Sequence, residues 1–250
     1  MTPLLLHGFT GSSQSWSQQI IDGLASSGRT PVPVDLPGHG RHIGETDPGR
    51  FTLESALHEL EDAAGPDPCP VAGYSMGGRI ALNYAVCRRH RVSHLILESA
   101  SPGLRTAEQR AERRVADHAL ADRIERDGVE AFVREWERKP LFESQRALSA
   151  NVREGQRALA AALRTLGTGA LPSCWEDLSG LDLPVLLLTG ALDRKFVGIA
   201  GDMARLLPRG RLVVVDDAGH AVHLERPDAW LSSVLAFLAE HRVALTDGWS

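Results

Sequence analysis

Short apolar runs recur along the chain, and most of them are followed by a turn and then by an amphipathic segment. The apolar runs predict six strands, at residues 3–7, 30–35, 70–74, 92–98, 184–190 and 211–216. Several runs are apolar at every position, as is typical of parallel strands that are buried on both faces. Helical periodicity predicts helices at residues 16–25, 53–63, 76–88, 198–207 and 227–241. The alternation predicts an α/β fold with a doubly wound, mostly parallel sheet of about six strands.

Residues 101–175 break this alternation, since they show helical patterns at 106–126 and 129–138 but no convincing strand. A helical insertion between two strands is expected to lie over the carboxyl ends of the strands, where such sheets bind their ligands. We therefore expect a core of residues 1–100 and 176–250, with residues 101–175 as a helical cap. The cap carries 13 Arg and Lys against 11 Asp and Glu, whereas the core carries 14 against 21. The relative excess of positive charge falls where a substrate is expected to bind.

The composition is that of an ordinary globular domain, with 43% hydrophobic and 24% charged residues in a chain of 250. A net charge of −5 argues against a nucleic-acid partner that binds without regard to sequence. No apolar stretch approaches the roughly 20 residues needed to span a bilayer. The N-terminus has neither the basic region nor the long apolar run of a secretory signal. We expect a cytoplasmic protein with no membrane or nucleic-acid partner, either a monomer or a small homo-oligomer.

The strongest local signal is the sequence Gly-Tyr-Ser-Met-Gly at residues 73–77, which is followed by Gly78. This GxSxG motif lies between an apolar strand, PVAGY, and an amphipathic helix, MGGRIALNYAV, which is the setting of a nucleophile elbow. The small residues two before and two after Ser75 allow the backbone to turn sharply and expose the hydroxyl group. A serine hydroxyl becomes reactive near neutral pH only when a neighbouring base takes its proton. We therefore expect Ser75 to be the catalytic serine.

The base that this serine requires is expected late in the chain, in the loop after the last strand. His220 follows the predicted strand RLVVVD and is our prediction for the base. His223 is the alternative, but it lies at the start of a helical region and is better interpreted as a structural or supporting group.

The acid that orients the histidine should follow the preceding strand. Asp193 stands there, after the predicted strand at residues 184–190. Asp182 precedes that strand and so lies at the wrong end of the sheet, and Asp216 and Asp217 are better interpreted as turn residues. The resulting order of serine, aspartate and histidine along the chain matches the α/β-hydrolase arrangement.

Negative charge that develops on an oxygen is stabilised by backbone N–H groups aimed at it. The amide of Met76, at the start of the helix that follows the serine, is one candidate for such an oxyanion hole. The second should come from the loop His-Gly-Phe-Thr-Gly at residues 7–11, and we predict the amide of Phe9. The loop at residues 35–40 is expected to shape the pocket, with His39 in a structural rather than a chemical role.

Arg79 lies four residues after Ser75, in the first turn of the predicted helix. A cation there opposes the positive end of the helix dipole, at a cost of about 0.3–1 kcal/mol. An anion held by the guanidinium group and the helix N-terminus together would account for it. The alternative is an arginine that reaches solvent or a surface acid. Lys195, two residues after Asp193, can add a second positive group, although a flexible surface lysine is the default interpretation.

Nine segments between residues 4 and 227 carry a resemblance to a known family. They are LLLHGFTGSSQSW, DLPGHG, GYSMGGRIAL, LILESASPGL, RAERR, FVREWERKPLF, LRTLGTG, LTGALDRKF and AGHAVHLERP. With these segments the sequence resembles the 2-succinyl-6-hydroxy-2,4-cyclohexadiene-1-carboxylate synthases of menaquinone biosynthesis, which have the α/β-hydrolase fold. The chain begins almost directly with LLLHG, so we expect the N-terminal hairpin of that fold to be missing.

The resemblance implies a lyase rather than a hydrolase. Members of this family remove pyruvate from a 5-enolpyruvyl cyclohexene carboxylate that also carries a succinyl group, and such a substrate bears three carboxylates. Ser75, activated by His220, is then implied to abstract a ring proton as a base. The oxyanion hole is implied to stabilise the charge that spreads onto the succinyl carbonyl.

The resemblance also implies which residues bind this small anionic substrate. Tyr74 and Arg79 flank the serine, and Trp136 lies in the cap over the pocket. Arg113 and Lys195 are further candidates for contacts with carboxylates.

A second arginine of the cap is implied as well. Arg146, Arg153 and Arg157 all lie where the family would supply one, and Arg153 is the preferred assignment.

Two other interpretations stay open on the sequence alone. The same triad serves carboxylesterases and carbon–carbon bond hydrolases, which form an acyl-enzyme or activate water. The fold can also serve as a ligand receptor without catalysis, which an intact triad argues against. We expect neither a nucleotide nor a metal cofactor, because the sequence lacks GxGxxG and P-loop motifs and its histidine pairs lack a third ligand on the same element.

Overall fold

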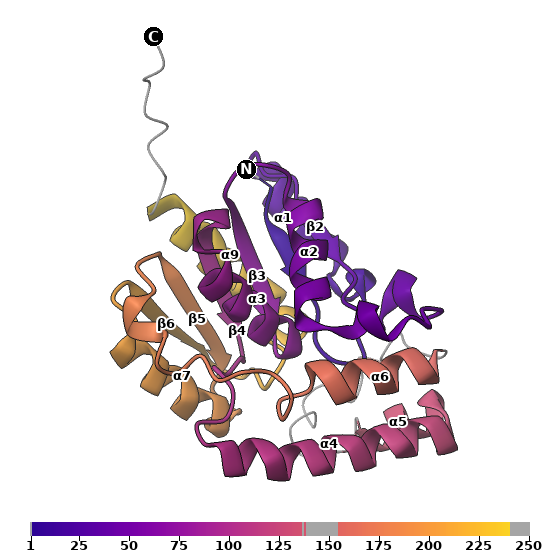
Figure 1. Ribbon diagram of the computed structural model, residues 1–250. Coiled ribbons are helices and arrows are strands. Elements are labelled where there is room, and N and C mark those ends of the chain that lie inside the picture. The colour runs from indigo at the N-terminus through magenta and orange to yellow at the C-terminus, as the bar shows by residue number, and fades with distance from the viewer. Residues whose placement is uncertain (1, 137, 139–154, 241–250) are drawn as a thin grey trace.

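One sheet of six strands forms the centre of the molecule (Figure 1). The structure, a computed structural model, describes residues 2–136, 138 and 155–240. The strands are β1 (Leu4–Leu6), β2 (Val32–Val34), β3 (Cys69–Tyr74), β4 (Val92–Glu98), β5 (Val185–Gly190) and β6 (Gly210–Val215). Their order in the sheet is β2-β1-β3-β4-β5-β6, and every neighbouring pair is parallel. The predicted α/β fold with about six strands is confirmed.

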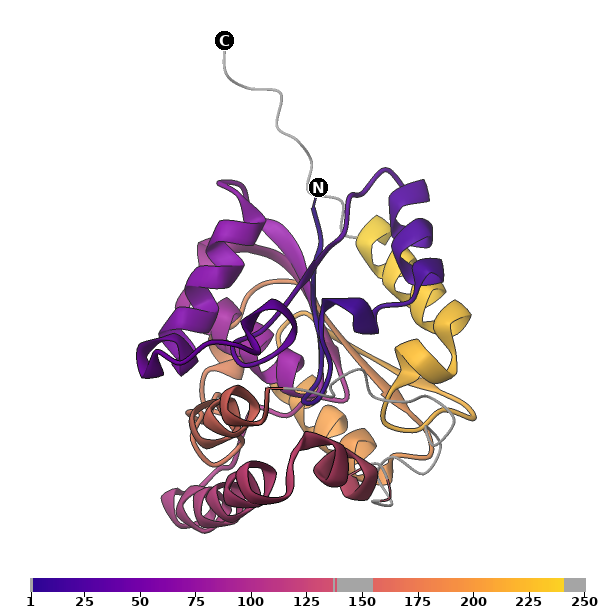
Figure 2. The ribbon, with the colours of Figure 1, turned by 90° about the vertical axis from the view of Figure 1, so that its right-hand side faces the viewer.

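Helices cover both faces of this sheet (Figure 2). On one face pack α1 (Gln18–Ser26) and α9 (Pro227–Glu240), and on the other α2 (Leu53–Ala64), α3 (Met76–Cys87) and α7 (Arg194–Leu206). The strands β1, β3 and β5 are buried at every position, which explains their continuous apolar sequences. The edge strands β2 and β6 are only partly buried.

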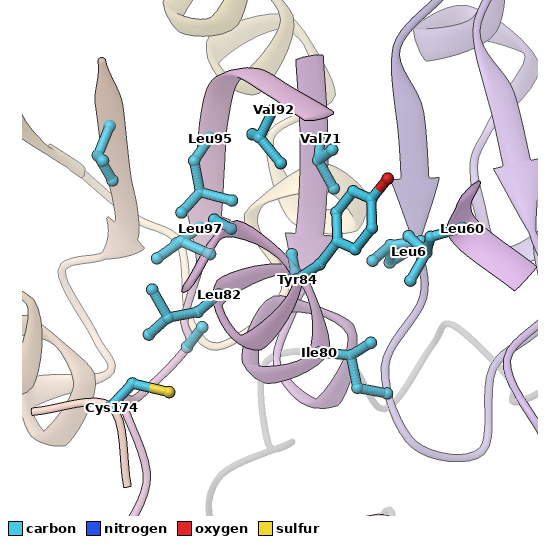
Figure 3. Close-up of a cluster of buried hydrophobic side chains, with 14 of the residues drawn as sticks. Leu6, Leu60, Val71, Ile80, Leu82, Tyr84, Val92, Leu95, Leu97 and Cys174 are labelled. Atoms are coloured by element: carbon cyan, nitrogen blue, oxygen red, sulfur yellow. The ribbon is translucent and has the colours of Figure 1, made fainter. Parts of the chain in front are cut away.

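The larger hydrophobic core lies between the sheet and the helices α2, α3 and α7. Ile80 and Tyr84 of α3 pack there together with Leu6 of β1 and Val71 of β3 (Figure 3). Helix α3 buries nine of its twelve residues. Because burial of one large apolar side chain is worth about 1.5–3 kcal/mol, this packing fixes α3, and with it the turn that precedes α3, against the sheet.

A separate layer of helices lies at the carboxyl end of the sheet (Figure 1). Its members are α4 (Ala107–Asp127), α5 (Val129–Trp136) and α6 (Gln156–Leu166). They share a small core of their own, which includes Ile124, Phe132 and Leu163. Where the structure describes residues 101–175 it contains no strand, as the sequence predicts.

Most helix boundaries lie within two residues of the predicted ones, but α7 begins four residues before the predicted helix at 198–207. The carboxylate of Asp193 accepts a hydrogen bond from the Phe196 amide (3.2 Å) and thereby caps the N-terminus of α7. The short helix α8 (Val222–Glu225) has no counterpart among the predicted ranges. Four residues are too few for helical periodicity to be recognised.

The longest described helix, α4, has 21 residues but is charged along much of its length. None of the described helices is long and apolar enough to cross a membrane.

The close approach of α3 to β1 predicts that Gly77 cannot be replaced without loss of stability. A Cβ atom at Gly77 would lie 2.4 Å from the carbonyl oxygen of Leu6 and 2.5 Å from that of His7. Because both obstacles are backbone atoms, we expect Gly77→Ala to lower the free energy of unfolding by about 1–3 kcal/mol. Gly198→Ala in α7 is the control, since a Cβ atom there meets nothing within 4 Å; it should raise that free energy by up to about 1 kcal/mol. Urea unfolding measures both, and equal effects would contradict this account.

Candidate active site

Ser75 occupies the turn between β3 and α3, with φ of 51° and ψ of −106°. Residues other than glycine rarely adopt a positive φ, and the close packing around this turn enforces it. A Cβ atom at Gly73 would lie 2.5 Å from the carbonyl oxygen of Gly77. The Ser75 amide donates to the backbone oxygen of Glu98 on β4 (2.9 Å). The turn therefore has the geometry of a nucleophile elbow.

His220 and Asp193 lie within hydrogen-bonding reach of this serine. His220 Nε2 is 3.0 Å from Ser75 Oγ, and His220 Nδ1 is 2.6 Å from Asp193 Oδ2. Because an ionised carboxylate only accepts hydrogen bonds, Nδ1 carries the proton and Nε2 accepts from the serine hydroxyl. His220 is 1% exposed and Asp193 7% exposed, so water competes little for these hydrogen bonds. The three residues predicted from the sequence thus form one chain of hydrogen bonds.

The two loops expected to supply oxyanion-hole amides meet beside the serine. Phe9 and Met76 both line the same pocket. Met76 is the first residue of α3, where the N–H groups lack intrahelical partners. The loop that carries Phe9 is held by His7, whose Nε2 accepts from the Leu36 amide (3.1 Å) and whose Nδ1 donates to the Gly8 carbonyl oxygen (2.8 Å).

His39 packs against two residues of this loop, His7 and Phe9. Its Nδ1 donates to the Pro37 carbonyl oxygen (2.9 Å), and its ring centre lies 5.0 Å from that of His7 and 5.7 Å from that of Phe9. Burial lowers the pKa of His39 to about 3 and the pKa of His7 to about 4. Both rings are therefore neutral near neutral pH, in keeping with the structural role predicted for His39.

A pocket of about 190 Å³ opens beside Ser75, and both the end of the sheet and the helices α4, α5 and α6 contribute to its wall. Three of its lining residues are cations: Arg79 from α3, Arg113 from α4 and Lys195 from α7. Among the described residues that line the pocket there is no Asp or Glu. The pocket is therefore suited to an anionic ligand.

Arg79 has a buried nitrogen whose hydrogen-bonding capacity no described residue uses. Its Nε is shielded from solvent and has no hydrogen-bond partner among the described residues. Burial and the positive charge of Arg113 lower the pKa of Arg79 to about 10, although Asp117 partly offsets them. The guanidinium group still carries its charge near neutral pH. Because a buried polar atom without a hydrogen-bond partner is unfavourable, the Nε that the described residues leave unpaired favours a ligand that accepts a hydrogen bond, such as an anion.

Arg113 reaches the pocket from α4 and is held in place by Asp117, one turn further along. Arg113 Nε donates to Asp117 Oδ1 (2.7 Å), and Asp117 Oδ2 accepts from the amide of Gly169 (3.1 Å). Asp117 is buried. Its carboxylate therefore fixes the direction of Arg113 and ties α4 to the segment that follows α6.

The other predicted binding residues occupy different positions. Lys195 lines the pocket near its exposed side, and Trp136 lines it from α5, with its ring centre 5.6 Å from that of Phe9. Tyr74 does not line the pocket; it is buried, and its ring centre lies 5.3 Å from that of His220. We interpret Tyr74 as support for the histidine rather than as part of the pocket wall.

None of the three candidates for a second arginine at residues 101–175 is found among the described residues that line the pocket. Arg146 and Arg153 lie outside the described residues. Arg157 is on α6, where it is exposed and does not line the pocket.

Trp175 lines the pocket but was not among the residues predicted from the sequence. Its indole N–H donates to the Gly103 carbonyl oxygen (3.0 Å), and the guanidinium carbon of Arg105 lies 3.6 Å from the ring centre. A tryptophan at the end of residues 101–175 is a signal that could have indicated this position, because so large a ring is usually buried and its N–H group usually finds a hydrogen-bond partner.

The chemistry of the pocket is that of an anion site. Within the described ranges, no group of three or more His, Cys, Asp or Glu side chains is arranged to hold a metal ion. The cations in the wall would repel a metal ion.

The chain belongs to the alpha/beta hydrolase family, whose sequence profile matches residues 4–233. Within that family it belongs with the 2-succinyl-6-hydroxy-2,4-cyclohexadiene-1-carboxylate synthases. A Bacillus subtilis (strain 168) protein provisionally named as such a synthase is 40% identical over 245 residues, which cover 93% of this chain and 88% of that protein. The synthase of Klebsiella pneumoniae subsp. pneumoniae is 30% identical, covering 94% of this chain and 93% of that protein.

A solved structure agrees with this placement. The structure of MenH from S. aureus matches with a TM-score of 0.89 at 32% sequence identity, covering 97% of this chain and 95% of that one. The family predicted from the loop sequences is therefore confirmed.

The buried neutral histidines predict how stability depends on pH. The pKa of His39 is about 3 in the folded protein and about 6.5 when unfolded. The unfolded state therefore binds more protons as the pH falls below 6.5, and stability is lost in that range. Between pH 8 and pH 5 this histidine accounts for a loss of about 2 kcal/mol. We expect His39→Asn, which keeps a donor for Pro37, to lose that much less than the wild type over this interval.

Urea unfolding at the two pH values measures this difference. His90→Asn, at an exposed histidine, is the matched control and should behave like the wild type. An identical pH dependence of the His39→Asn variant and the wild type would contradict the assignment.

Proposed function

We propose that this chain is a lyase that eliminates pyruvate from 2-succinyl-5-enolpyruvyl-6-hydroxy-3-cyclohexene-1-carboxylate, giving 2-succinyl-6-hydroxy-2,4-cyclohexadiene-1-carboxylate in menaquinone biosynthesis. The observation that carries the proposal is the charge of the pocket. Three cations, and no Asp or Glu among the described residues, line the pocket beside the hydrogen-bonded Ser75. The relatives named as synthases of this product support it.

Ser75 acts as the base in this reaction. His220 Nε2 takes the hydroxyl proton while Ser75 Oγ removes the ring proton next to the succinyl carbonyl. The electron pair of that C–H bond forms a new ring double bond, the existing double bond shifts by one position, and the C–O bond to enolpyruvate breaks. His220 becomes a cation when it takes the hydroxyl proton, and the Asp193 carboxylate stabilises that cation. Enolpyruvate then takes up a proton and becomes pyruvate.

The amides of Phe9 and Met76 act on the charge that develops during proton removal. That charge spreads onto the oxygen of the succinyl carbonyl, and two N–H groups aimed at it stabilise the transition state more than the ground state. Their positions at the pocket wall support this role.

The cations hold the three carboxylates of the substrate. Arg79 and Arg113 form charge-assisted hydrogen bonds with carboxylates, and Lys195 adds a point charge near the exposed side. Residues 101–175 act as a cap that keeps water from the bound substrate, with Trp136 in its wall. Arg153 of the same segment is the second cap arginine in this proposal.

A serine carboxylesterase or carbon–carbon bond hydrolase is the second candidate. The preformed hydrogen bonds at 2.6 Å and 3.0 Å favour it, because they would equally activate Ser75 as a nucleophile. The charge of the pocket argues for the lyase.

The proposal also includes a location and partners for the enzyme. The enzyme acts in the cytoplasm on a small anionic substrate, without nucleic acid, membrane or cofactor. We propose that it acts as a monomer or a small homo-oligomer.

Pyruvate release tests the proposed function. The unstable substrate is generated in situ by the enzyme that forms it, and pyruvate is followed by a coupled assay. We expect Ser75→Ala to lower kcat by about 10²- to 10⁴-fold, the range of general-base catalysis. Arg79→Ala should lower kcat/KM by roughly 10- to 150-fold, because a charge-assisted hydrogen bond worth about 1.5–3 kcal/mol is lost.

Arg89→Ala is the matched control, since Arg89 lies just beyond the other end of α3 and is exposed. It should leave the rate unchanged. Release no faster than the spontaneous reaction, with simple esters hydrolysed through Ser75, would refute the lyase and favour the hydrolase.

A further inference from the structure

Glu98, at the end of β4, is a buried acid for which the proposed reaction has no use. Its side chain is almost fully enclosed, with the residue 1% exposed. One carboxylate oxygen accepts hydrogen bonds from the amide (3.0 Å) and from Nδ1 (2.8 Å) of His223. The other accepts from the indole N–H of Trp230 on α9 (2.9 Å). A buried carboxylate that accepts three hydrogen bonds belongs to an ordered polar network, and such a network requires an explanation.

The same residue also holds the nucleophile elbow. The backbone oxygen of Glu98 accepts the hydrogen bond from the Ser75 amide at 2.9 Å. Glu98 therefore contacts the elbow through its main chain and His223 through its side chain. A single residue connects the serine to the helix that follows the catalytic histidine.

That helix, α8, controls the backbone on both sides of His220. The carboxylate of Glu225 accepts from the amide of Gly219 (2.7 Å) and from the amide of Ala221 (3.1 Å). His223 lies in the same short helix, and its hydrogen bonds to β4 fix the helix relative to the sheet. A shift of α8 would therefore move His220.

Aromatic packing makes a second connection between the two catalytic residues. The ring centre of His223 lies 4.7 Å from that of Tyr74 and 4.7 Å from that of Trp16. Tyr74 directly precedes Ser75, and its ring centre lies 5.3 Å from that of His220. Loss of the His223 ring would leave a cavity beside Tyr74, which is next to Ser75 in the chain and packs against His220.

We propose that Glu98 and His223 are positioning residues that set the distance between Ser75 Oγ and His220 Nε2. Neither lines the pocket, so both act through these two residues and not on the substrate. The inference rests on the catalytic roles proposed for Ser75 and His220, but it does not depend on the identity of the substrate.

Three variants separate positioning from plain stability. His223→Leu fills the space but removes both the ring and the side-chain donor to Glu98. His223→Asn restores a side-chain N–H close to the position of Nδ1. Trp230→Phe is the matched control, because it removes the donor to the other oxygen of the same carboxylate and leaves the hydrogen bonds of His223 in place.

The first readout is the rate at which a fluorophosphonate probe modifies Ser75. In that reaction the serine oxygen forms a bond to phosphorus, fluoride leaves, and the serine proton passes to His220. The rate therefore reports the contact between Ser75 and His220 without the lyase substrate. The second readout is the separation of kcat from KM for pyruvate release.

We expect His223→Leu to slow labelling and to lower kcat by about 10- to 100-fold, the effect of a displacement of about 1 Å in a catalytic group, with KM little changed. His223→Asn should recover most of that loss. Trp230→Phe should lower the thermal stability but keep labelling and kcat close to those of the wild type. His223→Met, which fills the site with a flexible apolar chain, replaces the leucine variant if that variant does not fold.

Wild-type labelling and kcat in His223→Leu or His223→Met would overturn the inference. Equal losses in these variants and in Trp230→Phe would also overturn it, because they would assign the network to stability alone. If the wild type itself resists labelling, the role proposed for Ser75 fails and the inference fails with it. Labelling without pyruvate release would refute the proposed reaction but not the positioning role.

Discussion

The positive φ of Ser75, at 51°, depends on how closely β1, β3 and α3 approach one another, since a side chain at Gly73 or Gly77 would meet backbone atoms. Strain of this kind costs about 1–3 kcal/mol, and the burial of nine of the twelve residues of α3 offsets it. The same turn brings Met76 and Arg79 to the pocket wall. One constraint on the backbone thus places the proposed base, the residue proposed to supply an oxyanion-hole amide and a cation within a single helical turn.

The charge around the serine, histidine and aspartate is the feature on which the choice between lyase and hydrolase depends in our proposal. A hydrogen-bonded serine, histidine and aspartate can serve either as nucleophile and base or as a base alone. The pocket wall adds Arg79, shielded and without a described partner at Nε, and Arg113, which is fixed by the buried Asp117. In the proposed reaction, such a wall holds a substrate rich in carboxylates so that a ring C–H bond faces the serine oxygen. In this account the cations decide the reaction, and the triad only supplies the proton acceptor.

The sequence predicts the sheet well because most of its strands are runs rich in apolar residues that are separated by clear turns. The predicted and observed bounds of β4, residues 92–98, are the same. The hydrogen-bonded arrangement of Ser75, Asp193 and His220 could also be expected, because Ser75 directly follows β3 while Asp193 and His220 lie in the loops after β5 and β6. The start of α7 was misplaced because the Asp193 side chain caps the helix, an effect of one hydrogen bond that periodicity does not show. Trp175 and the burial of Tyr74 depend on how distant segments pack. No local pattern contains that information, and the same holds for the contact between Glu98 and His223.

The central claim is that Ser75 removes a ring proton and never becomes acylated. A single-turnover measurement of pyruvate release tests it most directly, with substrate that carries deuterium at the ring carbon next to the succinyl carbonyl. The quenched enzyme is analysed by mass spectrometry in the same experiment. The account predicts a primary kinetic isotope effect on pyruvate release and an unmodified Ser75 at every time point. A rate that does not respond to deuterium, together with a substrate-derived adduct on Ser75, would contradict it.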